Sequence, residues 1–312
     1  MARWLTRLCP RGKLRYSAHV NFFGKGRASF GASVWMAPFW LASLWATPVI
    51  ALAMTQTRPE IVTQSVTPRG WVLVAHGMNL RPSRMQPLAE AVCNAESGLA
   101  CRILTFEGHE EGIPSRMRQV TAASWKATML EEIRLIRQQA GKKPVFFLGF
   151  SLGSLMGAWA MQQFEENPFE RAVLLAPPIE THAYARLAAL IPGPSHWTLP
   201  SRNHPEYRAN SGTSLGAYRA LFAIQDELRN AEPRGRQDDV LALVNPDDEL
   251  VSARKLRRRA ERSGWSRWQI EDVLTLRPSL SPVYQHLFID EPSMGSEAWE
   301  HLVSRIRSQI SR

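Results

Sequence analysis

The segment GFSLG at residues 149–153 places a serine between two glycines, a pattern suited to nucleophilic chemistry. An apolar run, PVFFLGF, ends directly before Ser151, and a segment with helical character follows it. A serine on the sharp turn between a strand and a helix exposes its hydroxyl above the sheet edge. Gly149 and Gly153 suit this turn because side chains two residues either side of the serine would collide there. The segment therefore predicts a nucleophile at Ser151.

The order of apolar and amphipathic segments predicts the scaffold for this serine. Strands are expected at residues 61–66, 71–76, 101–106, 144–150, 171–176, 240–245 and 268–276. Helices are expected near residues 83–95, 121–139, 152–164, 215–229, 252–263 and 296–310. This alternation indicates an α/β protein with a doubly wound, mostly parallel sheet and helices on both faces.

The predicted domain covers residues 71–312, behind a linker and edge strand at 55–70. Its strand and helix rhythm is interrupted at residues 177–214, which contain Pro177, Pro178 and four further prolines and show no clear strand period. A long irregular segment within a compact domain is usually functional. We therefore expect residues 177–214 to form an inserted cap, or lid, over the site.

Three motifs in this order resemble the α/β-hydrolase superfamily, within its esterases and monoacylglycerol or lysophospholipid lipases. They are HGMN at 76–79, GH at 108–109 and the elbow at 149–153, each after an expected strand. The resemblance covers about residues 60–312 and implies the α/β-hydrolase fold. It also implies an oxyanion hole made by the backbone N–H groups of Met78 and Leu152.

The same resemblance indicates which residues would complete a catalytic triad. The acid is expected after a late strand, in the stretch VNPDDELVS, where Asp247 and Asp248 compete. The family pattern, an acid followed by two residues and a valine, favours Asp248 because Val251 follows it. The base is expected near the C terminus, where SPVYQHLFIDEP contains His286. Serine, acid and histidine then occur in the chain order that this fold uses.

These residues predict a serine hydrolase that cleaves carboxylic esters through an acyl-enzyme. A peptidase, a thioesterase or a C–C hydrolase would use the same residues, and a noncatalytic binding protein on this scaffold is the alternative from another class. His76 and His109 are expected to orient loops. No cofactor and no metal are expected, since neither a phosphate-cradling loop nor a metal-ligand constellation occurs.

Two groups of side chains leave their roles open. Apolar residues of the expected cap either line an acyl pocket or pack onto the domain: Ile179, Leu187, Leu190, Ile191, Trp197 and Leu199. The expected helix at 252–263 carries basic residues that form either a solvated face or a contact for anionic headgroups: Arg254, Lys255, Arg257, Arg258, Arg259 and Arg262.

The N-terminal 54 residues read as an export signal or a membrane anchor. Residues 34–54 carry no charge, follow a basic segment and end in the small-x-small pattern Ala51-Leu52-Ala53. They are long enough to span a bilayer, although Pro38 and Pro48 weaken a spanning helix. We expect the protein to be exported to a periplasmic or extracytoplasmic location, or anchored to the inner membrane by residues 34–54.

The excess positive charge of the chain lies mostly in this leader. The formal net charge is +10, but seven basic and no acidic residues precede Val34, so 31 basic and 28 acidic residues remain. A nucleic-acid partner is therefore not expected.

Cys93 and Cys101 bracket a turn that contains glycine. In an oxidising compartment we expect a disulfide between them, the alternative being two half-buried cysteines.

Overall fold

The structure, a computed structural model, describes residues 60–63, 67–110, 113–231, 239–273 and 284–311. The leader predicted at residues 1–54, including the candidate anchor at 34–54, lies outside the described residues, as does the linker before Glu60. Among the described helices, none combines the length and the apolar character of a membrane span.

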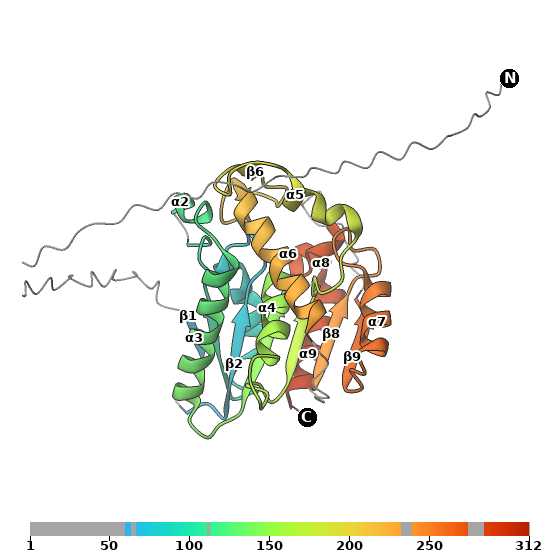
Figure 1. The fold of residues 1–312 in the computed structure, drawn as a ribbon. Coiled ribbons are helices and arrows are strands. Elements are labelled where there is room, and N and C mark those ends of the chain that lie inside the picture. Colours follow the sequence, from blue (N-terminus) through green and yellow to red (C-terminus); the bar gives the residue numbers. More distant parts are fainter. Residues whose placement is uncertain (1–59, 64–66, 111–112, 232–238, 274–283, 312) are drawn as a thin grey trace, which may run out of the picture. The chain divides into compact units, whose positions relative to one another are not determined.

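Seven strands form one sheet in the order β1-β3-β2-β4-β5-β8-β9 (Figure 1). Their bounds are β1 Glu60–Thr63, β2 Gly70–Ala75, β3 Leu99–Leu104, β4 Val145–Phe150, β5 Ala172–Leu175, β8 Val240–Val244 and β9 Trp268–Asp272. Neighbouring strands are parallel, except that β1 pairs antiparallel with β3 at the edge. The predicted mostly parallel sheet is confirmed.

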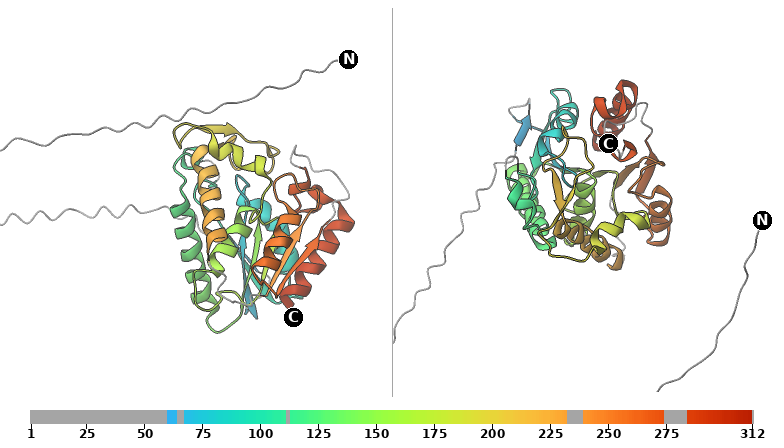
Figure 2. Two further views of the ribbon diagram at one scale, coloured as in Figure 1. Left: turned by 45° about the vertical axis from the view of Figure 1, so that its right-hand side comes forward. Right: turned by 90° about the horizontal axis from the view of Figure 1, so that it is seen from above.

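Helices cover both faces of this sheet (Figure 2). On one face pack α3 (Ala122–Ala140), α4 (Leu152–Met161) and α6 (Leu215–Asn230), which contact one another. On the other face, α1 (Gln86–Val92) contacts α9 (Ser296–Ser311). The remaining helices are α2 Pro114–Met117, α5 Leu187–Leu190, α7 Ala253–Arg262 and α8 Glu291–Met294, with 3-10 turns η1 Pro82–Met85, η2 Ala183–Arg186 and η3 Tyr284–His286.

The core lies along the central strands. Every residue of β2, β3, β4, β5 and β8 is buried. Strands covered on both faces by helices favour apolar side chains at most positions, so these segments read as nearly continuous apolar runs. The exception is Arg102 in β3, which is buried and forms an ion pair with Glu132 at 2.7 Å. The edge strand β9 is half-buried to exposed. This difference between centre and edge is what makes the central strands easy to identify from sequence.

The segment at 177–214 lies at the top of the view in Figure 1 and contains η2, α5 and a small hairpin. The hairpin pairs β6 (Thr198–Pro200) antiparallel with β7 (Gly212–Ser214). Strands of three residues are too short to give a sequence period, so the hairpin was not predicted. The start of α6, by contrast, is marked by Ser214, whose side chain accepts a hydrogen bond from the Ala217 N–H at 3.0 Å.

Most of the large apolar side chains of this segment are exposed. Leu187, Leu190 and Trp197 are 61%, 73% and 55% exposed, and Ile191 is also exposed, whereas Ile179 is buried and Leu199 is half-buried. The small residues Ala185 and Ala189 pack toward the core instead. The exposed side chains therefore do not pack onto the domain, and whether they line an acyl pocket stays a prediction.

Cys93 and Cys101 are joined by a disulfide that links the end of α1 to β3, with their Cα atoms 5.7 Å apart. Both residues are fully buried. A crosslink stabilises a fold mainly by restricting the unfolded chain, and for a loop this short the expected contribution is about 2.5 kcal/mol.

Candidate active site

Ser151 occupies a strained turn between β4 and α4. Its backbone has φ 49° and ψ −114°, a conformation that residues other than glycine rarely adopt. The turn is held from both sides, because the Ser151 N–H donates to the Leu175 carbonyl at 2.9 Å and the Leu155 N–H donates to the Ser151 carbonyl at 3.0 Å. Neighbouring strand and helix thus fix the direction of the hydroxyl.

The two glycines that flank this turn are required for different reasons. A Cβ on Gly149 would lie 2.7 Å from backbone atoms of Gly153 and Ser154, so the turn would collide with itself, as expected from the sequence. A Cβ on Gly153 would lie 2.3 Å from the carbonyl oxygen of Ala75 in β2. Gly153 therefore allows α4 to approach a neighbouring strand, which the sequence alone did not indicate.

The structure brings Ser151, His286 and Asp248 into one hydrogen-bonded chain. The distance from His286 Nε2 to Ser151 Oγ is 2.9 Å, and from His286 Nδ1 to Asp248 Oδ2 it is 2.8 Å. All three residues are buried, Asp248 to 2% exposure. In this geometry the serine hydroxyl donates to Nε2 and the Nδ1–H donates to the carboxylate, which is the arrangement a base-activated nucleophile needs.

The loop after β8 distinguishes the two competing aspartates. Asp248 Oδ1 accepts hydrogen bonds from the backbone N–H groups of Leu250 at 2.7 Å and Val251 at 2.8 Å, which leaves Oδ2 for His286. Asp247 is exposed, and its backbone N–H donates to the Asn245 side chain at 2.9 Å. The carboxylate that meets the imidazole is thus the one the family pattern favoured.

The turns that carry Met78 and Leu152 are joined directly, because the Gly153 N–H donates to the His76 carbonyl at 2.9 Å. Within the described part of the chain, neither the Met78 N–H nor the Leu152 N–H donates to a protein acceptor. A helix N-terminus such as that of α4 leaves its first N–H groups free to bind a ligand. Both donors are therefore available to an oxyanion, and that role stays a prediction.

Asn79 and Asn210 hold the Met78 turn in place, and sequence reasoning assigned neither a role. Asn79 has φ 52°, and its side chain accepts from the Asn210 N–H at 2.9 Å and donates to the Asn210 carbonyl at 3.0 Å. Asparagine tolerates positive φ, so its presence at the end of the HGMN segment indicates a left-handed backbone conformation at residue 79. No local signal marks Asn210, which lies 131 residues further along the chain.

His76 and His109 support the same turn as neutral, fully buried side chains. His109 Nε2 accepts from the Asn79 N–H at 2.7 Å, and His76 Nε2 accepts from the Phe106 N–H at 3.1 Å. Each Nδ1 must then carry the proton, and it faces a backbone carbonyl. Burial lowers the pKa of His109 to about 4, and burial together with the nearby His109 holds the pKa of His76 well below its usual range.

The depressed pKa of His109 predicts a loss of stability in mild acid. The unfolded chain binds a proton at His109 below about pH 6.5, whereas the folded protein does not until about pH 4. The stabilisation is fully present above pH 6.5 and falls as the pH decreases toward 4, by about 3 kcal/mol for His109 alone. Urea unfolding between pH 7 and pH 4.5 measures it.

The matched control for this measurement is His109→Gln, because glutamine offers an acceptor to the Asn79 N–H but does not titrate. Its free energy of unfolding should fall less steeply over the same pH range. Parallel curves for the parent and the variant would show that His109 takes up its proton equally in the folded and unfolded states, contrary to the prediction.

Comparison with known proteins gives a family-model match over part of the chain and a fold shared with solved structures. Residues 66–218 match the sequence model of a family described as serine aminopeptidase, S33. No curated protein sequence matches the chain.

Solved structures with the same fold include lipolytic enzymes. One, from work on LipS and LipT, two metagenome-derived lipolytic enzymes, has a TM-score of 0.63 at 20% identity and covers 82% of this chain and 98% of its own. The monoglyceride lipase of Saccharomyces cerevisiae has a TM-score of 0.62 at 12% identity, covering 80% of this chain and 89% of its own. The monoacylglycerol lipase of Paleococcus ferrophilus has a TM-score of 0.58 at 19% identity, covering 80% of this chain and 99% of its own.

Proposed function

Because this chain has the α/β-hydrolase fold, and its residues 66–218 match a serine aminopeptidase family model, we propose that it is a serine hydrolase that cleaves carboxylic esters through an acyl-enzyme. The observation that carries the proposal is the continuous hydrogen-bonded chain from Ser151 through His286 to Asp248. The strained elbow and the free N–H groups beside it add the two further parts that acyl transfer requires. A noncatalytic binding protein would need neither the hydrogen-bonded triad nor the strained elbow and the N–H donors beside it.

The proposed reaction has two halves. In the first, Ser151 Oγ attacks the ester carbonyl carbon while His286 Nε2 accepts the hydroxyl proton, and Asp248 stabilises the imidazolium that forms. The N–H groups of Met78 and Leu152 bind the oxyanion, and His286 returns the proton to the leaving alcohol as the C–O bond breaks. In the second half, water attacks the acyl-enzyme carbonyl carbon while His286 Nε2 accepts its proton. His286 then returns that proton to Ser151 Oγ as the bond between Oγ and the acyl carbon breaks and the acid product leaves.

Exposed apolar side chains in the segment 177–214 support an apolar ester as substrate. Tyr184, Leu187, Leu190 and Trp197 are all more than half exposed within 14 residues of one another. Exposed apolar clusters of this kind mark surfaces that bind apolar ligands or partners. We therefore propose that the acyl or alcohol part of the ester is hydrophobic, as in the monoglycerides that name two of the structurally similar enzymes.

A peptidase is the second candidate, because the matching family is described as a serine aminopeptidase. Rates with p-nitrophenyl esters of graded acyl length, measured beside aminoacyl p-nitroanilides, discriminate between the two. We expect a higher kcat/KM for the esters, with an optimum above acetate. Faster cleavage of the anilides would favour the peptidase, and absence of turnover with both substrate types would contradict a hydrolase.

We also propose that the protein is exported or held at the inner membrane by residues 34–54. The uncharged segment behind a basic leader supports this placement. The buried Cys93–Cys101 disulfide supports an oxidising compartment. Fluorophosphonate labelling of fractionated cells tests the nucleophile and the location together, and labelling found only in the cytosolic fraction would contradict the placement.

A further inference from the structure

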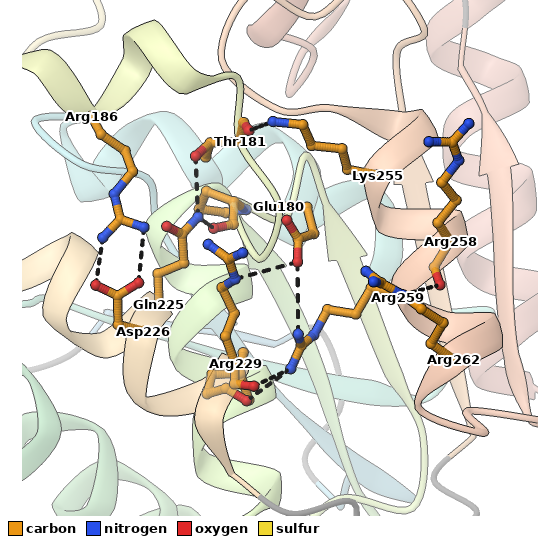
Figure 3. A network of polar contacts seen from close by, with 12 residues as sticks. Glu180, Thr181, Arg186, Gln225, Asp226, Arg229, Lys255, Arg258, Arg259 and Arg262 are labelled. Atoms are coloured by element: carbon orange, nitrogen blue, oxygen red, sulfur yellow. Dashed lines mark hydrogen bonds and ion pairs between the residues drawn. The ribbon is translucent and has the colours of Figure 1, made fainter. Parts of the chain in front are cut away.

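A cavity of about 590 Å³ lies where the start of the 177–214 segment meets the end of α6 and one side of α7 (Figure 3). We call it the α7 cavity. Five of its lining side chains are cationic: Arg186, Arg229, Lys255, Arg258 and Arg262. Two are acidic, Glu180 and Glu261. Its volume is within the range of small-molecule sites, and neither Ser151, Asp248 nor His286 lines it.

Two of these cations are already matched by carboxylates of the protein. Arg186 makes a two-point contact with Asp226, in which one hydrogen bond measures 2.8 Å. Arg229 lies 3.4 Å from a carboxylate oxygen of the buried Glu180, and Arg259 approaches the same oxygen at 3.8 Å. Glu180 is therefore neutralised by the two arginines beside it, and it adds no free negative charge to the cavity.

Lys255, Arg258 and Arg262 remain without such partners. Their spacing of three and four residues places them along one face of α7. In the part of the chain that the structure describes, no carboxylate lies within ion-pair distance of any of them. The Lys255 ammonium donates to the Thr181 carbonyl at 2.9 Å, and Arg262 Nε donates to the Arg258 carbonyl at 3.2 Å.

Two further basic residues of α7, Arg257 and Arg259, lie near carboxylates, whereas Arg254 is exposed and does not line the cavity. Arg257 forms an ion pair with Asp272 at 2.6 Å. Arg259 has a buried Nε without a hydrogen-bond partner. Burial lowers the pKa of Arg259, and repulsion from Arg229 and Arg262 lowers it further against the attraction of Glu180. The surroundings of α7 thus hold excess positive charge that an anion would relieve.

We propose that the α7 cavity binds a phosphate group, carried either by a small soluble ester or by a lipid headgroup. Three unmatched cations against the single Glu261 leave a local charge of about +2, and a phosphate monoester carries about −1.5 to −2 at pH 7. The two guanidinium groups can each donate a pair of hydrogen bonds to phosphate oxygens, and the ammonium adds a compact positive charge, as in other protein phosphate sites. The proposal goes beyond ester hydrolysis and does not depend on it.

The segment that lines the cavity at Glu180 and Thr181 is hydrogen-bonded to the loop that carries Asp248. The Ser252 N–H donates to the Glu180 carbonyl at 2.9 Å, and the His182 N–H donates to the Leu250 carbonyl at 3.0 Å. Lys255 reaches the same segment through Thr181. A phosphate held by Lys255 and Arg258 would therefore brace this segment, so bound ligand should raise the thermal unfolding temperature of the full-length protein.

Calorimetric titration with inorganic phosphate and with glycerol 3-phosphate, at ionic strength held constant with chloride, tests the proposal. We expect saturable binding, weakened roughly 3- to 10-fold by Arg258→Gln or Arg262→Gln, since charged hydrogen bonds at exposed sites contribute modestly. Arg254→Gln is the matched control, because Arg254 is an exposed arginine of the same helix that does not line the cavity.

Flotation with phosphatidylcholine vesicles, with and without phosphatidic acid, distinguishes the two sources of phosphate. If phosphatidic acid increases vesicle binding, and Arg258→Gln reduces this increase while Arg254→Gln does not, the ligand is a lipid headgroup. Saturable binding of the soluble phosphates without that increase would assign a soluble ester. Equal weakening by Arg254→Gln and Arg258→Gln, or no saturable binding of any probe, would overturn the proposal, whatever the outcome of the esterase assays.

Discussion

Replacing Ser151 with alanine should lower kcat for p-nitrophenyl esters by roughly 10⁴- to 10⁶-fold and abolish covalent labelling by fluorophosphonates. The substitution removes the oxygen that lies 2.9 Å from His286 Nε2 and leaves the backbone turn in place. The imidazole then has no hydroxyl to deprotonate, and no acyl-enzyme forms. Steady-state rates and in-gel labelling of purified protein measure the two effects.

A suitable control is Ser115→Ala, because Ser115 is an exposed serine on the short helix α2. It should label and turn over as the parent protein does. Unchanged thermal unfolding of the Ser151→Ala protein would show that the loss is chemical. Labelling of Ser151→Ala at the parent rate would place the nucleophile elsewhere and remove the basis of the proposed mechanism.

Replacing Asp248 with asparagine should lower kcat by about 10⁴-fold, with little effect on folding. Asparagine keeps a carbonyl oxygen to accept the Leu250 and Val251 N–H groups, so the loop can retain its shape. It removes the negative charge beside His286 Nδ1, and its amide donor favours the wrong imidazole tautomer. The effect should therefore appear in kcat with the unfolding temperature nearly unchanged.

The neighbouring Asp247→Asn substitution is the matched control, since it makes the same chemical change one residue away. Asp247 is exposed, and its side chain makes no contact with His286 in the structure. We expect its kcat to stay within about twofold of the parent value, as for most exposed surface substitutions. A larger loss with Asp247→Asn than with Asp248→Asn would show that the acid has been misassigned.

Much of the fold could be predicted because the parallel strands are buried on both faces. Strands such as β2 and β4 read as unbroken apolar runs, and the amphipathic segments between them read as helices. The small hairpin of β6 and β7 could not be predicted, since three-residue strands carry no period. Whether Leu187, Leu190 and Trp197 pack onto the domain could not be decided from the sequence, because the exposure of a side chain depends on segments that are distant in the chain.

Part of the candidate site was equally accessible. The elbow at Ser151 is local, so five residues and their flanks were enough to identify it. The choice of Asp248 and His286 depended on family pattern and chain order, and their roles stay predictions until the variants are measured. The contacts of Asn79 with Asn210 and His109 were missed, because each joins segments that are distant in sequence and carries no local signature.

The sequence by itself determined the succession of strands and helices and the strained serine turn, because both depend on side-chain periodicity and backbone sterics over a few residues. Only the tertiary structure decided which carboxylate meets His286, which loops brace the Met78 turn, and which cations of α7 lack a partner. Those outcomes depend on distances between segments far apart in the chain, and distances of a few ångströms determine whether a charge is paired or free.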